Sequence, residues 1–186
     1  MSNAPWKKWL PYVVAVAAFF VLAVGYFSPV LEGKRLKQQD IMQYRVMAQE
    51  MVELREAVDG EEPLWTGSMF SGMPAYQIGV VWPSNARNWL DAVMHGFLPR
   101  PASFIFLYLV GMFILLSCLR VDPWLALLGA IAFALSSYFL IIIHAGHNSK
   151  ATAVGYMPMV LGGLYVLLRG RKLLCAALFA LFLAMQ

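Results

Sequence analysis

Asp40 is the carboxylate whose position in the sequence best suits chemistry. It lies about ten residues beyond an apolar segment long enough to cross a bilayer, so we expect it near a membrane surface. There it could act as a catalytic base or bind a divalent cation such as Mg²⁺ or Mn²⁺, opposite a lipid-linked substrate whose reactive head lies at the same depth. The alternative is that Asp40 only caps the helix that follows it.

A second polar cluster extends from His144 to Lys150. A continued helical turn would place His144, His147 and Asn148 on one side, although Gly146 weakens that expectation. Together with Lys150 they could bind a phosphate or pyrophosphate group through charge-assisted hydrogen bonds. Two histidines alone predict no metal site, because spacing fixes no third ligand. The alternative is a polar turn at the membrane interface with a snorkelling lysine.

Other residues could also contact a substrate. Arg45, just over one turn beyond Asp40, could pair with it or bind an anionic group, the alternative being an ordinary surface ion pair. Aromatic rings could stack on a sugar face, although aromatic residues are common at membrane interfaces. The aromatic candidates are Trp65, Phe70, Tyr76 and Trp82.

Composition predicts an all-α integral membrane protein. Hydrophobic residues make up 61% of the chain and charged residues 13%, against about 25% in soluble domains. The net charge of +4 does not indicate nucleic acid binding, because no basic stripe alternates with exposed aromatic residues. Cys118 and Cys175 both lie in apolar runs, so we predict neither a disulfide nor a metal ligand.

Apolar segments predict four transmembrane helices and the beginning of a fifth. Basic residues at alternate ends indicate a cytoplasmic N-terminus, with Asp40 and the 144–150 turn on the outer face. The last segment is too short to cross and is expected to be cut off within a helix. The predicted parts are an N-terminus at 1–8, spans at 9–30, 102–119, 124–143 and 151–168, an outer loop at 31–101, an outer turn at 144–150 and the truncated span at 173–186.

The outer loop carries nine of the ten acidic residues, so we expect it to be folded and functional. Apolar residues spaced by three to four predict an amphipathic helix over 40–58, with Glu50 on its solvated face. Residues 63–74 predict an irregular ordered loop. Residues 88–98 predict a helix with an apolar side along the membrane surface. Small residues in the later spans, such as Gly111 and Gly155, predict close helix packing, and Pro158 predicts a kink.

Several stretches resemble the YfhO family of bacterial multi-spanning membrane proteins. The resemblance implies the GT-C superfamily, membrane glycosyltransferases that use polyprenyl-phosphate sugars and need an acidic residue in the first outer loop, a position that Asp40 matches. It implies transfer to a cell-envelope glycan or lipid acceptor. The later spans and C-terminal domain of the family are absent, so we expect this portion alone to be inactive. The matching stretches are KQQDIMQY (37–44), EPLW (62–65), SMFSGMPAYQ (68–77), SSY (136–138) and AGHNSK (145–150).

Two other functions remain open. A transporter or flippase should place ionisable groups at mid-membrane, but the second to fourth predicted spans contain no Asp, Glu, Lys or Arg. A non-catalytic membrane scaffold could use the outer loop to bind a partner.

Overall fold

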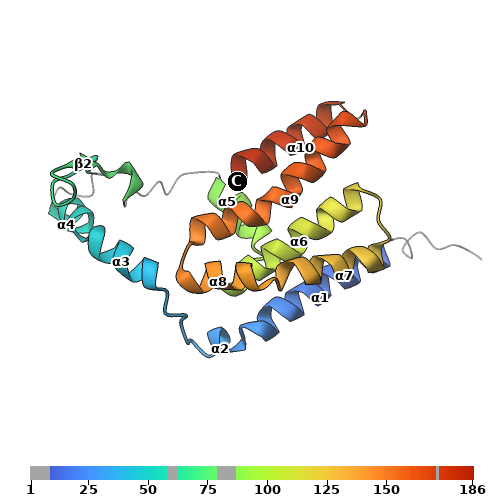
Figure 1. Ribbon diagram of the computed structural model, residues 1–186, viewed down its shortest axis with the longest axis horizontal. Coiled ribbons are helices and arrows are strands. Elements are labelled where there is room, and N and C mark those ends of the chain that lie inside the picture. The colour runs from blue at the N-terminus through green and yellow to red at the C-terminus, as the bar shows by residue number, and fades with distance from the viewer. Residues whose placement is uncertain (1–8, 58–62, 79–86, 171) are drawn as a thin grey trace, which may run out of the picture.

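A computed structural model describes residues 9–57, 63–78, 87–170 and 172–186. Within this part of the chain the only strands form a two-stranded hairpin, so the predicted all-α fold is confirmed apart from that hairpin. The elements are α1 (Leu10–Tyr26), α2 (Ser28–Leu31), α3 (Gln39–Met47), α4 (Gln49–Ala57), β1 (Trp65–Thr66), β2 (Met73–Pro74), η2 (Ala75–Gln77), α5 (Arg87–Met94), α6 (Ala102–Cys118), α7 (Pro123–Ala134), α8 (Ser137–Ala145), α9 (Asn148–Leu168) and α10 (Lys172–Met185). Figure 1 shows α1 and α6 to α10 gathered in a bundle, with α3, α4 and the hairpin forming an arm at one side.

Helix α6 is the centre of the bundle and packs against α1, α7 and α9. Its residues are apolar on all sides, as expected for a helix surrounded by others. The Phe113 ring meets the rings of Tyr12 and Phe19 from α1 edge-on, at centroid distances of 5.9 and 5.4 Å. Helix α10 packs on the outer side of α9. The bundle is therefore held together by apolar contacts around one central helix.

Glycines bring α6 and α9 into close contact, as the sequence predicts. A Cβ atom added to Gly111 would lie 2.4 Å from the backbone oxygen of Gly155. A Cβ on Gly155 would in turn lie 2.5 Å from the Leu107 side chain. Small residues at such a crossing let two backbones approach and gain dispersion contacts. The prediction of close packing at these positions is confirmed.

The predicted spans correspond to helical segments, but only some are long enough to cross a membrane. Helix α9, with 21 residues, is long and apolar enough, and it continues through Pro158 as one helix. Helices α7 and α8 qualify only as a pair, with a bend of 47° between them. Helices α1 and α6 have 17 residues each, fewer than the ~20 that a bilayer needs. The described residues thus contain one such helix, or two with the bent pair, and five spans stay a prediction.

Two predicted spans are interrupted. A single helix over 124–143 is wrong, because α7 ends at Ala134 and Ser136 is extended, at φ −57° and ψ 131°. Adjacent serines are a common site of helix kinks, since their side chains compete for backbone hydrogen bonds. The first predicted segment is divided at Phe27, after which Pro29 lies in the first turn of α2.

Both ends of the bundle carry distinct charges. The α6–α7 and α9–α10 connections lie at one end, with Arg120 and Arg169. The α8–α9 turn, the start of α6 and the beginning of α3 lie at the other end (Figure 1). The predicted alternation of the helices is therefore present, and Asp40 is at the end opposite these two arginines.

The outer arm differs from the amphipathic helix that the sequence predicts. That helix is interrupted at Ala48, where α3 ends and α4 follows. Of the apolar residues spaced by three to four, Tyr44, Met47 and Leu54 are 41%, 42% and 37% exposed, whereas Met51 is buried. The apolar residues spaced by three to four therefore do not form one buried face on the arm. The prediction of a single amphipathic helix is wrong.

Glu50 attaches the hairpin to α4, which corrects its predicted place on a solvated face. Its carboxylate accepts hydrogen bonds from the Thr66 and Ser68 hydroxyls and from the backbone N–H groups of Gly67 (2.9 Å) and Ser68 (3.0 Å). The predicted irregular loop over 63–74 therefore contains an antiparallel hairpin, with Trp65 opposite Pro74 and Thr66 opposite Met73. The hairpin is thus held by the Glu50 carboxylate of α4, a contact that local sequence patterns did not indicate.

Candidate functional site

The candidate site is built around a contact between Asp40 and His147. His147 Nδ1 lies 2.9 Å from Asp40 Oδ2, and the two side chains are 54% and 43% exposed. Asp40 comes from the first turn of α3, and His147 is the residue before α9. The structure thus brings together one residue from each of the two predicted polar clusters.

Asp40 is not the N-cap of its helix. The N-cap of α3 is Gln38, whose side chain makes no capping hydrogen bond, and Asp40 is an acidic residue of the first turn. Its carboxylate pairs with His147 instead of with Arg45, the partner suggested by sequence spacing. The capping alternative is therefore not what fixes the Asp40 side chain.

Gly146 permits the close approach of α3 to the α8–α9 turn. Its φ of +102° is in the left-handed region that favours glycine. A Cβ atom there would lie 3.0 Å from Gln38 Cβ and 3.4 Å from Asp40 Cβ. Helix α8 ends at this point, so the turn does not continue as a helix with His144, His147 and Asn148 on one side, in agreement with the doubt that Gly146 raised.

Gln38 connects the two segments through its side-chain amide. Its Nε2 donates to the Ile143 carbonyl oxygen at 2.6 Å and to Asn148 Oδ1 at 3.2 Å. One amide thus joins the end of α8, the start of α9 and the start of α3. Gln38 was not a candidate from the sequence, because an uncharged amide beside a carboxylate carries no chemical signal of its own.

An open pocket of about 570 Å³ lies beside the Asp40–His147 pair. Its polar lining includes Asp40, His147, Asn148, Lys150 and Arg100. Four of these were candidates from the sequence, and Arg100 was not. The structure thus brings four of the candidate residues together around one pocket and adds an arginine from the segment before α6.

Lys150 is held at the edge of this pocket by Tyr138. Its Nζ donates to Tyr138 Oη at 2.8 Å and lies 5.3 Å from the centre of the same ring. The ammonium group therefore has a fixed position and keeps donor capacity for a ligand. The snorkelling alternative places the ammonium in the same region, so it is compatible with this contact.

A larger basic pocket of about 830 Å³ adjoins the first and shares Ile41, Tyr44, Arg100 and Asn148 with it. Five cationic residues line this basic pocket: Lys34, Arg35, Lys37, Arg45 and Arg100. Of these, Lys34 pairs with Glu32 at 2.7 Å. Excess positive charge around a concave surface attracts anions.

The N-terminus of α9 adds to this potential. His147 is its N-cap and makes no side-chain capping hydrogen bond, and the helix continues for 21 residues. Exposed N–H groups and the helix dipole at such an end favour a bound phosphate or carboxylate. The N-terminal residues Asn148, Ser149 and Lys150 line the Asp40 pocket.

The remaining sequence candidates lie away from the Asp40–His147 pair. His144 is exposed near the end of α8 and is not among the residues that line the pocket. Trp65 and Tyr76 belong to the hairpin region of the arm, and Trp82 lies outside the described residues. The structure therefore does not bring the Trp65 and Tyr76 rings to the carboxylate.

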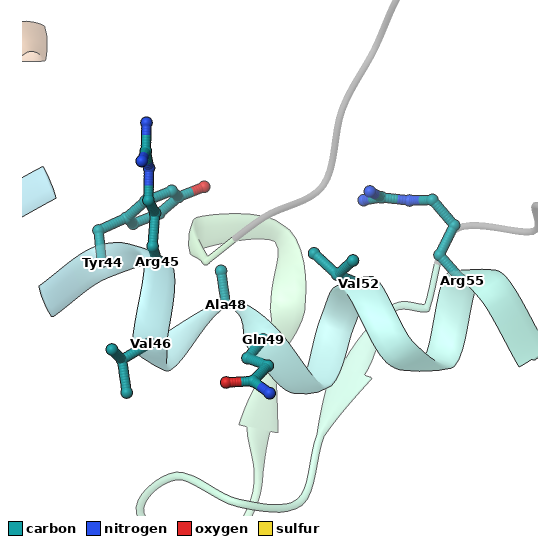
Figure 2. Close-up of a pocket in the computed structure, with 7 residues that line it drawn as sticks. All are labelled: Tyr44, Arg45, Val46, Ala48, Gln49, Val52 and Arg55. Atoms are coloured by element: carbon teal, nitrogen blue, oxygen red, sulfur yellow. The ribbon is translucent and has the colours of Figure 1, made fainter. Parts of the chain in front are cut away.

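Arg45 lies on the arm, where it also lines a third pocket of about 520 Å³. Figure 2 shows Arg45 beside Tyr44, with Ala48, Val52 and Arg55 farther along the same helices. Tyr44 lines this pocket and the Asp40 pocket, so the arm surface continues into the candidate site.

The residues that the structure describes contain no group of three or more His, Cys, Asp or Glu side chains placed to hold a metal ion. Asp40 and His147 supply two donors. Mg²⁺ is commonly held by one or two carboxylates together with phosphate oxygens of a substrate. The Asp40 carboxylate suits that arrangement only when a phosphate completes the coordination.

Comparison with protein-family models, curated proteins and solved structures finds no match for this chain. The resemblance to the YfhO family therefore depends on the short motifs alone. The functional assignment depends on the geometry of the Asp40 pocket.

Proposed function

We propose that this chain carries the phosphate-binding and base-bearing part of a membrane glycosyltransferase. The enzyme takes a sugar from a polyprenyl-phosphate donor and transfers it to a cell-envelope glycan or lipid on the outer face of the bacterial inner membrane. The observation that carries the proposal is the Asp40–His147 pair beside a pocket lined by Arg100 and Lys150.

Membrane placement is supported by the surface of the bundle. Large apolar side chains are exposed on several of its helices, among them Val21, Leu128, Ile141 and Leu161. Exposed apolar surface of this extent suits contact with lipid. Arg120 and Arg169 lie in short connections between helices, where Lys and Arg favour the cytoplasmic side, whereas the basic residues at the other end belong mostly to the long segment 31–101, which counts less; the Asp40 pocket therefore faces outward.

Phosphate binding is supported by the charges around the pocket. Arg100 and Lys150 line it, the α9 N-terminus faces the same region, and further basic residues surround the adjoining basic pocket. Guanidinium and ammonium groups bind phosphate through charge-assisted hydrogen bonds. A lipid-linked phosphate at the end of the bundle would lie at the depth of these groups.

In the proposed reaction, an acceptor hydroxyl oxygen attacks the anomeric carbon of the donor sugar. The bond from that carbon to the phosphate oxygen breaks, its electron pair goes to the phosphate, and the hydroxyl proton passes to Asp40. His147 holds Asp40 Oδ2, which fixes the orientation of the carboxylate. In place of acting as the base, Asp40 could hold a Mg²⁺ or Mn²⁺ ion together with phosphate oxygens of the donor, and the ion would neutralise charge on the leaving phosphate.

The variants Asp40→Asn and Arg100→Ala test separately the catalytic role of the carboxylate and the binding of the phosphate. Asp40→Asn should lower sugar transfer in membranes of the producing bacterium by about 100-fold or more, because a general base contributes roughly 10²–10⁴-fold. It should leave binding of polyprenyl phosphate in nanodiscs unchanged. Arg100→Ala should weaken that binding about tenfold, the effect of losing one charge-assisted hydrogen bond.

Arg120→Gln is the matched control, since it removes an arginine from the opposite end of the bundle. Full transfer by Asp40→Asn would remove the carboxylate from the mechanism. Equal binding losses in Arg100→Ala and Arg120→Gln would contradict a specific phosphate site.

A further inference from the structure

We infer that a second pocket, centred on Asp91, binds the hydroxyl groups of a carbohydrate. This pocket has a volume of about 370 Å³, within the range of ~300–1,000 Å³ typical of small-molecule sites. It lies between α5 and the beginning of α9. Its lining residues, all with side chains that could bind a ligand, are Asn88, Asp91, Arg100, Asn148, Ser149, Thr152 and Gln186.

Helix α5 turns its polar side toward this pocket. Trp89 and Val93 are 76% and 54% exposed, whereas the Asp91 side chain is 25% exposed. A helix on a soluble protein ordinarily has the reverse arrangement, with its apolar side against the core. Helix α5 therefore presents Trp89 and Val93 outward and Asn88 and Asp91 toward the pocket, while Met94 packs against the buried apolar cluster that includes Tyr156.

Asp91 is held in position by two buried residues behind it. The hydroxyl of Tyr156, a fully buried residue of α9, donates to Asp91 Oδ1 at 3.0 Å. His95 Nε2 lies 3.5 Å from the same oxygen. These contacts fix the carboxylate, while part of it remains accessible from the pocket.

His95 is 5% exposed, and neither ring nitrogen has a hydrogen-bond partner within the described part of the chain. Its 3.5 Å approach to Asp91 meets the distance for an ion pair but not the geometry of a hydrogen bond. Buried polar groups in folded proteins are nearly always paired, and exceptions are concentrated at functional sites. A small movement of Asp91 on ligand binding would give His95 its partner.

The chemistry of the lining favours hydroxyl groups. A carboxylate accepts hydrogen bonds from hydroxyls, and amides and hydroxyl side chains can donate to or accept from them. Each pocket contains one aspartate and both share Arg100, but Lys150 adds a second cation to the Asp40 pocket, so a phosphate is better suited to that pocket than to this one. A neutral ligand with several hydroxyls satisfies these groups.

The two pockets share Arg100, Asn148 and Ser149. A ligand whose phosphate contacts Arg100 in the Asp40 pocket can therefore extend a sugar toward Asp91. The assignment to a carbohydrate rests on the proposed glycosyltransferase function. The sugar could belong to the donor or to the acceptor, since both present the same hydroxyl chemistry.

The inference is tested by measuring ligand affinity for the Asp91→Asn variant, with the protein in nanodiscs. Three probes are compared: polyprenyl phosphate, the same lipid carrying a sugar, and a soluble cell-envelope oligosaccharide. Asparagine keeps an acceptor for Tyr156, so the fold should be retained. The variant should bind polyprenyl phosphate normally and lose about tenfold in affinity for one sugar-bearing probe. Loss with the lipid-linked sugar assigns the pocket to the donor, and loss with the oligosaccharide assigns it to the acceptor.

Glu53→Gln is the matched control, because it removes a carboxylate from the arm. Unchanged binding of both sugar-bearing probes by Asp91→Asn would overturn the inference, and so would an equal loss for all three probes. Failure of the wild type to bind polyprenyl phosphate would count against the proposed function alone, since the soluble oligosaccharide still tests the Asp91 pocket.

Discussion

Gly146 controls the approach of Asp40 to His147. Its positive φ and the 3.0 Å distance from a Cβ to Gln38 mean that alanine there is both strained and crowded. Gly170 has a similar φ of +118° with nothing within 4 Å of a Cβ. These two glycines differ in their surroundings and share their backbone strain.

Gly146→Ala should therefore destabilise the protein more than Gly170→Ala. Each should lose about 1–2 kcal/mol from the left-handed backbone, and Gly146→Ala should also displace α3 and reduce sugar transfer. Thermal unfolding and transfer assays on both variants check this. Equal effects would show that contact with α3 is unimportant.

Glu50 makes the hairpin sensitive to acid. Hydrogen bonds, first from the Ser68 hydroxyl and then from Thr66 and two backbone N–H groups, lower its pKa from 4.5 to about 2. A carboxylate with a lowered pKa stabilises the folded state above its unfolded pKa, and this contribution is lost as the pH falls through the folded value.

Hairpin attachment should thus be complete above pH 4.5 and weaken as the pH falls from there toward about 2. Fluorescence of Trp65 in the variant Glu50→Gln should show a detached hairpin at neutral pH and little further change in that window. Glu53→Gln, from the same helix, should behave like the wild type. An acid transition that persists in Glu50→Gln would assign the effect to another group.

The α6–α9 crossing is the element contact with least room for change. Gly111 faces the Gly155 backbone, whereas Gly25 of α1 has nothing within 4 Å of a Cβ. Both residues are within helices, where alanine is intrinsically favoured by up to about 1 kcal/mol. Alanine at Gly111 therefore tests interhelical packing together with helix propensity, whereas alanine at Gly25 tests helix propensity alone.

Gly111→Ala should lower the unfolding temperature, because a 2.4 Å contact with backbone forces the helices apart. Gly25→Ala should leave it unchanged or raise it slightly. Thermal unfolding in detergent compares the two. A stable Gly111→Ala variant would mean that the helices can separate at little cost.

The whole bundle has two chemically different ends. The Asp40 end carries the candidate site, and the opposite end carries Arg120 and Arg169. This division predicts how the protein sits in the membrane.

Single cysteines test that orientation in a background where Cys118 and Cys175 are replaced by alanine. Lys34→Cys and Ser149→Cys should react with an impermeant thiol reagent in intact spheroplasts, and Arg120→Cys should react only after permeabilisation. Labelling of Lys34→Cys and Arg120→Cys from the same side would refute the orientation.

Local patterns in the sequence were sufficient for the helices of the bundle. Apolar runs indicated α1, α6, α9 and α10, since helix formation and hydrophobic burial depend on neighbouring residues. They also placed Asp40 and the 144–150 turn at one end. They failed at Ser136 and Ala48, where the helices are interrupted without a proline or glycine.

The site itself was decided by tertiary structure. Asp40, His147 and Lys150 were recognisable as chemical groups, but their partners were not. Gln38 and Asn148 are 110 residues apart, and Asp91 meets Tyr156 only after α5 packs on α9. Sequence alone determined which residues carry charge and which segments are helical; folding decided which charges meet, because such contacts depend on how distant helices pack.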